Sequence, residues 1–166
     1  MIRPRTLASI LTYTAGSVIG SALQLAIVPQ KPPEVRSPLL PPGPVIGVVW
    51  TVLFAMLGAA RAKLHGHPRE QLMVDSLWLG CLSYPLYTDG MRNRPAAYAG
   101  NIATILTTAA IVARIRRVSP AAARLVLPVI PWVIFATIGI AAEPGLSTST
   151  ELVTTSDDVH NGAYHA

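Results

Sequence analysis

Charged residues are scarce in this chain. Only 13% of its 166 residues are Asp, Glu, Lys or Arg, whereas about 25% is usual for a water-soluble domain. The shortage is concentrated in long uncharged blocks, 51% of all residues are hydrophobic, and the mean hydropathy is +0.46. Blocks of this kind predict membrane-spanning helices and not the core of a soluble domain.

Cysteine is scarcer still. Cys81 is the only one and stands inside an apolar block, which excludes a disulfide framework and a cysteine metal site. His65 and His67 lie two residues apart without a third candidate ligand, so we expect loop positions for both and no metal site. Because no nucleophile–base pair falls within the apolar blocks, the sequence offers no catalytic residue and indicates no required cofactor.

The charges that are present are mostly basic. The formal net charge is +5, from 13 basic and 8 acidic residues. The basic residues stand in short clusters between the apolar blocks, which is typical of the flanks of membrane helices and not of a nucleic-acid interface. We therefore expect membrane lipid, and no nucleic acid, as a partner.

The apolar blocks predict an all-α membrane protein with a bundle of five transmembrane helices in one domain, residues 1–142. The expected spans are about 7–28, 43–62, 72–88, 95–113 and 125–142. A cleaved signal peptide is the alternative for the first block, but 25 uncharged residues, 6–30, exceed the 7–15 apolar residues of such a peptide.

The third block is the shortest. Its uninterrupted part, residues 76–88, has 13 residues, so it spans a membrane only if Asp75 lies at the interface. Asp89 is expected at a solvated helix end in the same way. Pro85 should kink or end this helix.

Two segments outside the spans have distinctive compositions. Seven of the 15 prolines fall in residues 29–44, which predicts an extended loop that serves either as a lid over a binding site or as a passive spacer. Residues 143–166 are rich in Ser and Thr and contain no Lys or Arg, which predicts a disordered acidic tail.

The distribution of Lys and Arg predicts the orientation. Five spans place nine of these residues on the side of the N-terminus and four on the other side. The positive-inside rule therefore predicts a cytoplasmic N-terminus. Two pairs of small residues, Gly16 with Gly20 and Ser76 with Gly80, have the spacing that lets helices approach closely and would support a homodimer.

Two motifs carry a resemblance to a known family. Residues 41–60 read PPGPVIGVVWTVLFAMLGAA, and the last block contains Leu-Pro, then Trp132, then Phe-Ala-Thr. Together with the five-span layout, they resemble the TspO/MBR family, which includes the translocator protein and the bacterial tryptophan-rich sensory proteins. The similarity covers about residues 7–142. The matching positions are Leu11, Thr12, Tyr13, Pro41, Pro42, Gly47, Trp50, Thr51, Leu53, Phe54, Gly58, Ala59, Leu127, Pro128, Trp132, Phe135, Ala136 and Thr137.

The resemblance implies a five-helix bundle, commonly a homodimer, with a ligand pocket between the helices that the first loop covers. It implies a hydrophobic ligand, either a tetrapyrrole such as protoporphyrin IX or haem, or a lipid-like molecule, bound for sensing, scavenging or transport. Light- and oxygen-dependent porphyrin degradation and a structural or regulatory role through partner proteins are the alternatives.

The family's pocket tryptophans correspond to Trp50 and Trp132. Phe54 shares a helix face with Trp50, and the small Ala136 beside Trp132 would leave a slot for a flat ligand. We also expect ligand contacts from Pro42, Thr51, Leu82 and Ser83.

The chain departs from the family pattern at three places, one of which is near Ile140, where a polar residue is expected late in the fifth helix. Pro44 stands near the position of a frequent tryptophan, and residues 79–83 contain neither the Asn nor the aromatic residue that the third helix usually has. These departures predict a smoother and less polar pocket.

Overall fold

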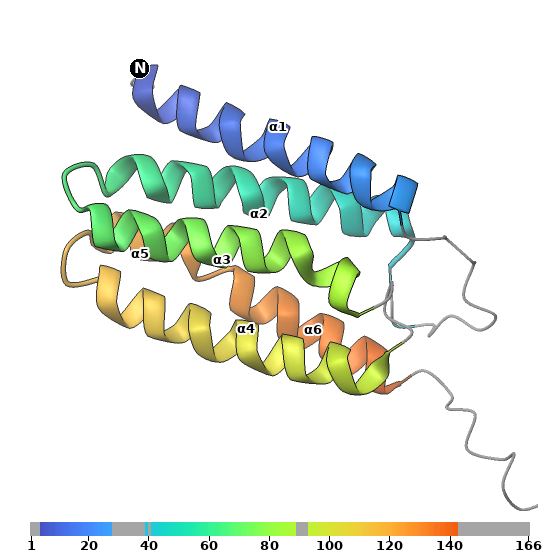
Figure 1. Ribbon diagram of the computed structural model, residues 1–166. Coiled ribbons are helices and arrows are strands. Elements are labelled where there is room, and N and C mark those ends of the chain that lie inside the picture. Colours follow the sequence, from blue (N-terminus) through green and yellow to red (C-terminus); the bar gives the residue numbers. More distant parts are fainter. Residues whose placement is uncertain (1–3, 28–38, 40, 89–92, 143–166) are drawn as a thin grey trace, which may run out of the picture.

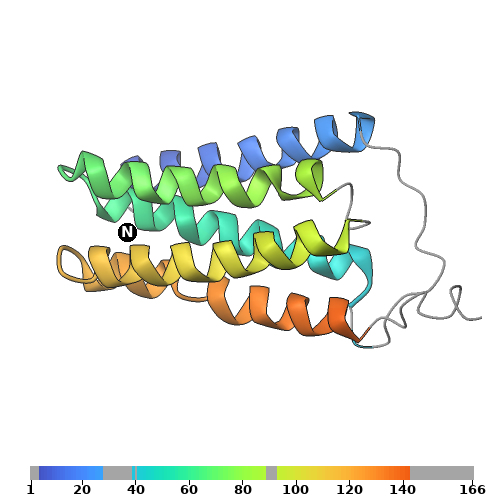
Figure 2. The same ribbon diagram turned by 60° about the horizontal axis from the view of Figure 1, so that its bottom comes forward.

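The computed structural model describes residues 4–27, 39, 41–88 and 93–142, and its regular elements there are all helices. They are α1 (Pro4–Ile27), α2 (Gly43–Lys63), α3 (Pro68–Tyr87), α4 (Arg94–Ile115), α5 (Pro120–Val126) and α6 (Val129–Ala141). The helices lie side by side, and α6 continues in the direction of α5 (Figures 1 and 2). The α2–α3 and α4–α5 turns lie at the same end of the bundle as the start of α1.

Four stretches are long and apolar enough to cross a membrane. They are Pro4–Gln24, Gly43–Lys63, Arg94–Ile115 and Pro120–Ala141, the last of which joins α5 to α6. The third expected span, α3, is 20 residues long but is not among them, because its first half carries the polar residues Arg69, Glu70, Gln71 and Asp75.

Proline marks the start of most helices. A proline occupies the first or second position of α2, α3, α4 and α5, where the backbone N–H that proline lacks would have no intrahelical acceptor. Asn93 and Ser119 cap α4 and α5, since their side-chain oxygens accept from the amides of Ala96 (3.1 Å) and Ala122 (3.3 Å). Prolines and caps together separate one apolar block from the next.

The buried Thr14 hydroxyl has no hydrogen-bond partner among the described residues, but seven other hydroxyl groups of the helices and their ends are satisfied locally. Each donates to the backbone carbonyl four residues earlier, which spares it an unpaired polar group in a hydrocarbon environment. The residues are Thr12, Ser17, Thr51, Thr88, Thr104, Thr108 and Thr137.

The best-packed core lies in the half of the bundle nearest the two short turns. Its fully buried apolar side chains come from the second half of α2, the first half of α3, the end of α4 and the α5–α6 region. They include Leu57, Leu64, Val74, Ile115, Val126 and Val129. This half holds the helices together and leaves the other half free to be hollow.

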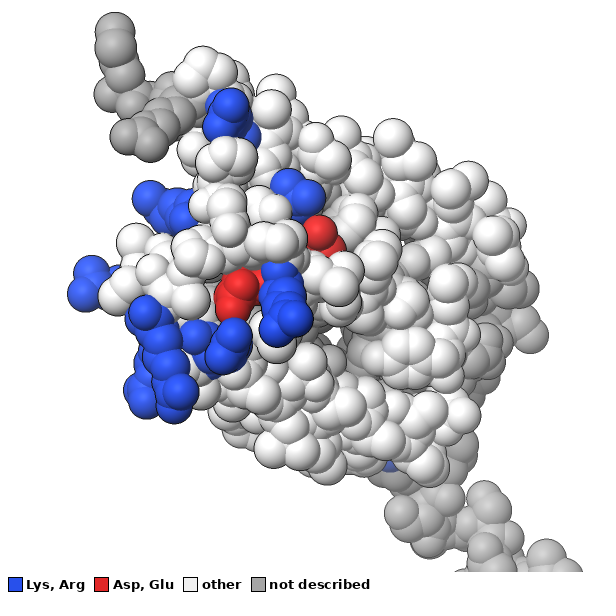
Figure 3. All heavy atoms as spheres, turned by 60° about the vertical axis from the view of Figure 1, so that its left-hand side comes forward, with Lys and Arg blue, Asp and Glu red and all other residues white. Residues whose placement is uncertain are grey.

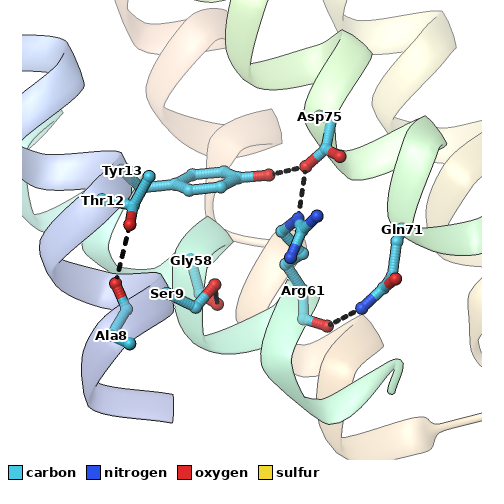
Figure 4. A network of polar contacts seen from close by, with 8 residues as sticks. All are labelled: Ala8, Ser9, Thr12, Tyr13, Gly58, Arg61, Gln71 and Asp75. Atoms are coloured by element: carbon cyan, nitrogen blue, oxygen red, sulfur yellow. Dashed lines mark hydrogen bonds and ion pairs between the residues drawn. The ribbon is translucent and has the colours of Figure 1, made fainter. Parts of the chain in front are cut away.

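The expected place of Asp75 at a helix end is wrong. Because α3 begins at Pro68, Asp75 lies about two turns inside the helix. Its carboxylate accepts from the Tyr13 hydroxyl and from Nε of Arg61, 2.8 Å away (Figure 4). Its place is therefore explained by an ion pair between helices and not by solvation. Asp89 lies outside the described residues.

The pair Gly16 and Gly20 faces the inside of the molecule. A Cβ atom on Gly16 would stand 3.0 Å from the Trp78 ring, and one on Gly20 would stand 2.9 Å from Leu82. The pair therefore allows α1 to approach α3 in the same chain, which corrects its expected role in dimerisation. Ser76 and Gly80 are exposed on α3.

Two predicted segments lie wholly or mostly outside the described residues, whereas the predicted histidines and Pro85 lie within them. The tail, residues 143–166, and most of the Pro-rich loop, residues 28–38 and 40, lie outside them. His65 and His67 are exposed in the α2–α3 turn. Pro85 stands inside α3, which ends two residues later at Tyr87.

Candidate ligand-binding site

One wall of the site is the first half of α2. Pro42 precedes the helix and its carbonyl oxygen accepts from the amides of Val45 and Ile46, so the Pro-Pro-Gly sequence sets the start of α2. Trp50 and Phe54 follow the first residue of α2, Gly43, by seven and eleven residues. Their rings stack with centroids 5.4 Å apart. The i, i+4 spacing thus builds an aromatic surface on one helix face.

The opposite wall is α6. A break in the helix after α5 shifts α6 away from the line of α5. Pro128 and Pro131 lack the backbone N–H that an uninterrupted helix would use here, and the helix breaks at Leu127–Pro128. As a result, α5 packs against α2 while α6 packs against α4. Trp132 still reaches Trp50 in an edge contact, with ring centroids 6.5 Å apart.

Between these walls lies a cavity of about 780 Å³, which is within the usual range for small-molecule sites. Helices α1, α2, α3, α4 and α6 all contribute to it. Val48 and Val52 line the cavity although their side chains are 64% and 53% exposed, so it opens at the side of the bundle. Aromatic and small apolar side chains dominate its surface, including Trp50, Phe54, Tyr84, Trp132, Phe135 and Ala136.

Few polar groups face the cavity, and most have partners. The Asn101 amide donates to the Thr137 hydroxyl (2.9 Å), and the Ser17 hydroxyl accepts from the Trp78 indole (2.9 Å). Gln24 donates to the carbonyl oxygen of Leu82. The indole N–H of Trp132 is buried and has no hydrogen-bond partner among the described residues.

The cavity brings together six of the eight residues predicted from the sequence. They are Trp50, Thr51, Phe54, Leu82, Trp132 and Ala136. Pro42 does not line it, because its role is to begin α2, and Pro41 and Pro44 line the cavity instead. Ser83 also lies away from it, and its hydroxyl donates to the carbonyl oxygen of Gly80. That these residues bind a ligand stays a prediction.

Among the lining residues that were not predicted from the sequence, three supply an aromatic ring or an amide group. Tyr84 supplies the third-helix aromatic ring that residues 79–83 lack, and Asn101 supplies an amide from α4. Phe135 packs on Trp132 with ring centroids 5.7 Å apart. Tyr84 lies one residue beyond residues 79–83. Asn101 is the one amide side chain in the fourth apolar block, which is a sequence signal for a polar group in the pocket. The cavity is mostly apolar, as expected, but Tyr84 gives its α3 wall an aromatic ring.

The third tryptophan stands apart from the cavity. Trp78 packs on Tyr13, with ring centroids 4.8 Å apart, between α3 and α1. It does not line the cavity. Among the described residues, no group of three or more His, Cys, Asp and Glu side chains could hold a metal ion.

Apolar helices long enough to span a membrane, arranged around an aromatic-walled cavity, define a multi-pass integral membrane protein. The sequence model of the TspO/MBR family matches residues 8–141, which is most of the chain. The protein belongs to the TspO/MBR family, as the Trp50 and Trp132 motifs predicted. No curated protein sequence matches the chain.

Proposed function

We propose that the protein binds a hydrophobic small molecule in the cavity between α2 and α6. A tetrapyrrole such as protoporphyrin IX or haem is the preferred candidate, and a lipid-like molecule is the second. The observation that carries the proposal is the aromatic lining of the cavity, with Trp50, Tyr84 and Trp132 contributed by three different helices. Flat aromatic ligands stack on such rings in offset or edge arrangements.

The side opening supports a ligand that arrives from the lipid. Val48 and Val52 line the cavity and are exposed on the face of an apolar helix. A ligand soluble in lipid would enter there without crossing a polar surface. The unpaired Trp132 indole would then donate to a carbonyl or carboxylate of the ligand, and an unpaired buried donor costs about 1–3 kcal/mol. Sensing, scavenging and transport all begin with this binding step.

Filling the cavity tests the proposal. Gly47 lines it, and a Cβ atom there would meet nothing within 4 Å, so Gly47→Leu places a side chain in free space. We expect weaker binding of protoporphyrin IX to the detergent-solubilised variant, by roughly tenfold or more, measured by the porphyrin absorbance on titration.

The matched control is Gly80→Leu. Gly80 also has open space around its Cβ position, but it is outside the cavity. This control should bind porphyrin as the wild type does. Equal affinities of the wild type, Gly47→Leu and a Trp50→Phe/Trp132→Phe double variant would contradict the proposal. A Trp78→Phe variant provides the tryptophan control, because this ring does not itself line the cavity and only its indole N–H bonds to the lining residue Ser17.

We also propose that α3 is a fifth span. At about 1.5 Å per residue, its 20 residues cover about 30 Å, the thickness of a hydrocarbon core. Its carboxylates are partnered within the bundle. Asp75 bonds to Arg61, and Glu70 bonds to Arg114 with an Nη2–Oε1 distance of 3.1 Å. Pairing of this kind lowers the cost of ionised groups near or within a membrane.

A further inference from the structure

A second, smaller hollow lies at the opposite end of the bundle from the cavity. It measures about 310 Å³ and is bounded by α1, by the end of α2 with its following turn, and by α3. Its polar lining consists of Arg5, Ser9, Thr12, Arg61, His65 and Gln71. Nothing in the proposed ligand site uses these residues.

Positive charge predominates in this hollow. The Nε of Arg61 is bonded to Asp75 (2.8 Å), so one of the two arginines is balanced by a carboxylate. Nη1 of Arg5 lies 2.9 Å from Nε2 of His65. Because arginine stays protonated, His65 Nε2 is the acceptor in this contact. Among the described residues, Arg5 has no carboxylate partner, and the hollow therefore has an uncompensated cation.

The neighbouring side chains hold the hollow open. The Ser9 hydroxyl donates to the carbonyl oxygen of Gly58 (2.8 Å), and the Gln71 amide donates to the carbonyl oxygen of Arg61 (3.2 Å) (Figure 4). These bonds fix α1 and α3 to α2 on both sides of the hollow. Its walls are therefore set by contacts that do not involve a ligand.

The hollow lies where membrane headgroups would be. All the described Lys and Arg residues except Arg94 lie at this end of the bundle, and Figure 3 shows them gathered there. Exposed leucines neighbour the lining residues in the sequence of the same helices. Leu7 and Leu11 on α1 are 49% and 59% exposed, and Leu72 on α3 is 64% exposed.

We propose that this hollow binds the phosphate group of an anionic membrane lipid. Arg5 donates to the phosphate oxygens, Arg61 adds positive charge, and the acyl chains lie against Leu7, Leu11 and Leu72. A guanidinium group bonds to phosphate through two parallel N–H donors, which suits it to this role. The adjacent apolar surface favours a lipid over free phosphate, because only a lipid uses both features.

Native mass spectrometry of the full-length protein in detergent tests the site. The probes are short-chain phosphatidylglycerol, phosphatidylcholine of the same chain length, and inorganic phosphate. We expect phosphatidylglycerol to bind most tightly. Arg5→Gln should weaken this binding roughly tenfold or more, because it removes a charge-assisted hydrogen bond, and Arg5→Lys should restore part of it.

Arg117→Gln is the matched control. Arg117 is exposed at the same end of the bundle and does not line the hollow, so its loss should reduce binding no more than about fivefold through the general surface potential. Equal losses for Arg5→Gln and Arg117→Gln would mean diffuse attraction and would overturn the proposal. Equal binding of the two lipids would overturn it too, and so would inorganic phosphate that displaces the lipid at matched concentrations.

The test is independent of the large cavity. Gly47→Leu should leave the binding of phosphatidylglycerol unchanged, and Arg5→Gln should leave the binding of porphyrin unchanged. Thermal unfolding of Arg5→Gln provides the check on folding. A variant that unfolds like the wild type but binds phosphatidylglycerol as the wild type does would also overturn the proposal.

Discussion

At Gly58 the backbone of α2 lies close to that of α1, and the Gly58 carbonyl oxygen accepts from the Ser9 hydroxyl. A Cβ atom there would stand 2.8 Å from the carbonyl oxygen of Ser9 and 3.0 Å from Cα of Ile10. Both atoms belong to backbone, which cannot yield as a flexible side chain can. Any larger residue therefore has to push the two helices apart.

We expect Gly58→Ala to lower the free energy of unfolding by about 1–3 kcal/mol, the usual cost of overpacking. Gly80→Ala is the control, since its Cβ position is open, and it should be neutral or gain up to about 1 kcal/mol of helix propensity. The buried thiol of Cys81, the chain's one cysteine, reports unfolding when it reacts with a fluorogenic maleimide. Equal unfolding curves for the two variants would contradict the tight crossing.

Single residues also show where sequence reasoning reaches its limit. Trp50, Phe54 and Trp132 could be assigned to a pocket because local spacing and family motifs point to them. Asp75 could not be placed, since its partners Tyr13 and Arg61 are 62 and 14 residues away in the chain. Asn101 was also missed because its partner is distant in the sequence. Its amide donates to Thr137 on α6, 36 residues away in the chain.

At the scale of elements, the break between α5 and α6 shapes the cavity. The apolar block predicted one helix, and the prolines near its start were visible in the sequence. Their consequence was not visible, because the offset of α6 from α2 depends on how α5 packs against α2 and α4. Local sequence therefore predicts that a helix forms here, whereas the position of that helix in the bundle depends on tertiary contacts.

We expect the double substitution Pro128→Ala/Pro131→Ala to weaken porphyrin binding while retaining the folded state. Both residues would regain a backbone N–H, so α5 and α6 could join into a continuous helix and turn Trp132 away from Trp50. Titration with protoporphyrin IX measures the effect. Pro95→Ala, at the start of α4 where proline interrupts nothing, is the control and should bind normally. Unchanged affinity in the double variant would contradict the role of the break.

The exposed face of α3 is the place where we expect a second copy of the chain. Ser76 and Gly80 lie four residues apart on this face, and Gly80 has open space at its Cβ position. Close approach of two such faces is a common basis of helix association in membranes. Native mass spectrometry should show a dimer for the wild type and a shift toward monomer for Gly80→Leu. Gly43→Leu, whose Cβ position is also open, should remain dimeric, and a wild type that is monomeric would refute this expectation.

The whole molecule divides into two halves with different roles. The half near the α2–α3 and α4–α5 turns holds the packed core and nearly all the described basic residues. The other half holds the cavity and the Pro-rich entry to α2. The fully buried apolar side chains and the cavity therefore lie toward opposite ends, although Phe54, Cys81 and Val133 belong to the buried core and also line the cavity.

The same division predicts the orientation of the protein in the membrane. The basic half should face the cytoplasm, because positively charged flanks are retained there, so the cavity half should face the opposite side. Cysteine labelling in a Cys81→Ala background tests this prediction in intact cells with a membrane-impermeant maleimide. Gly43→Cys, at the exposed start of α2, should react directly, whereas Ala121→Cys, exposed at the start of α5, should react only after permeabilisation. The reverse pattern would refute the orientation. Labelling of both sites on the same side would refute a bundle that spans the membrane, since α2, α3 and α4 lie between the two sites in the chain and must together cross it an odd number of times to separate them.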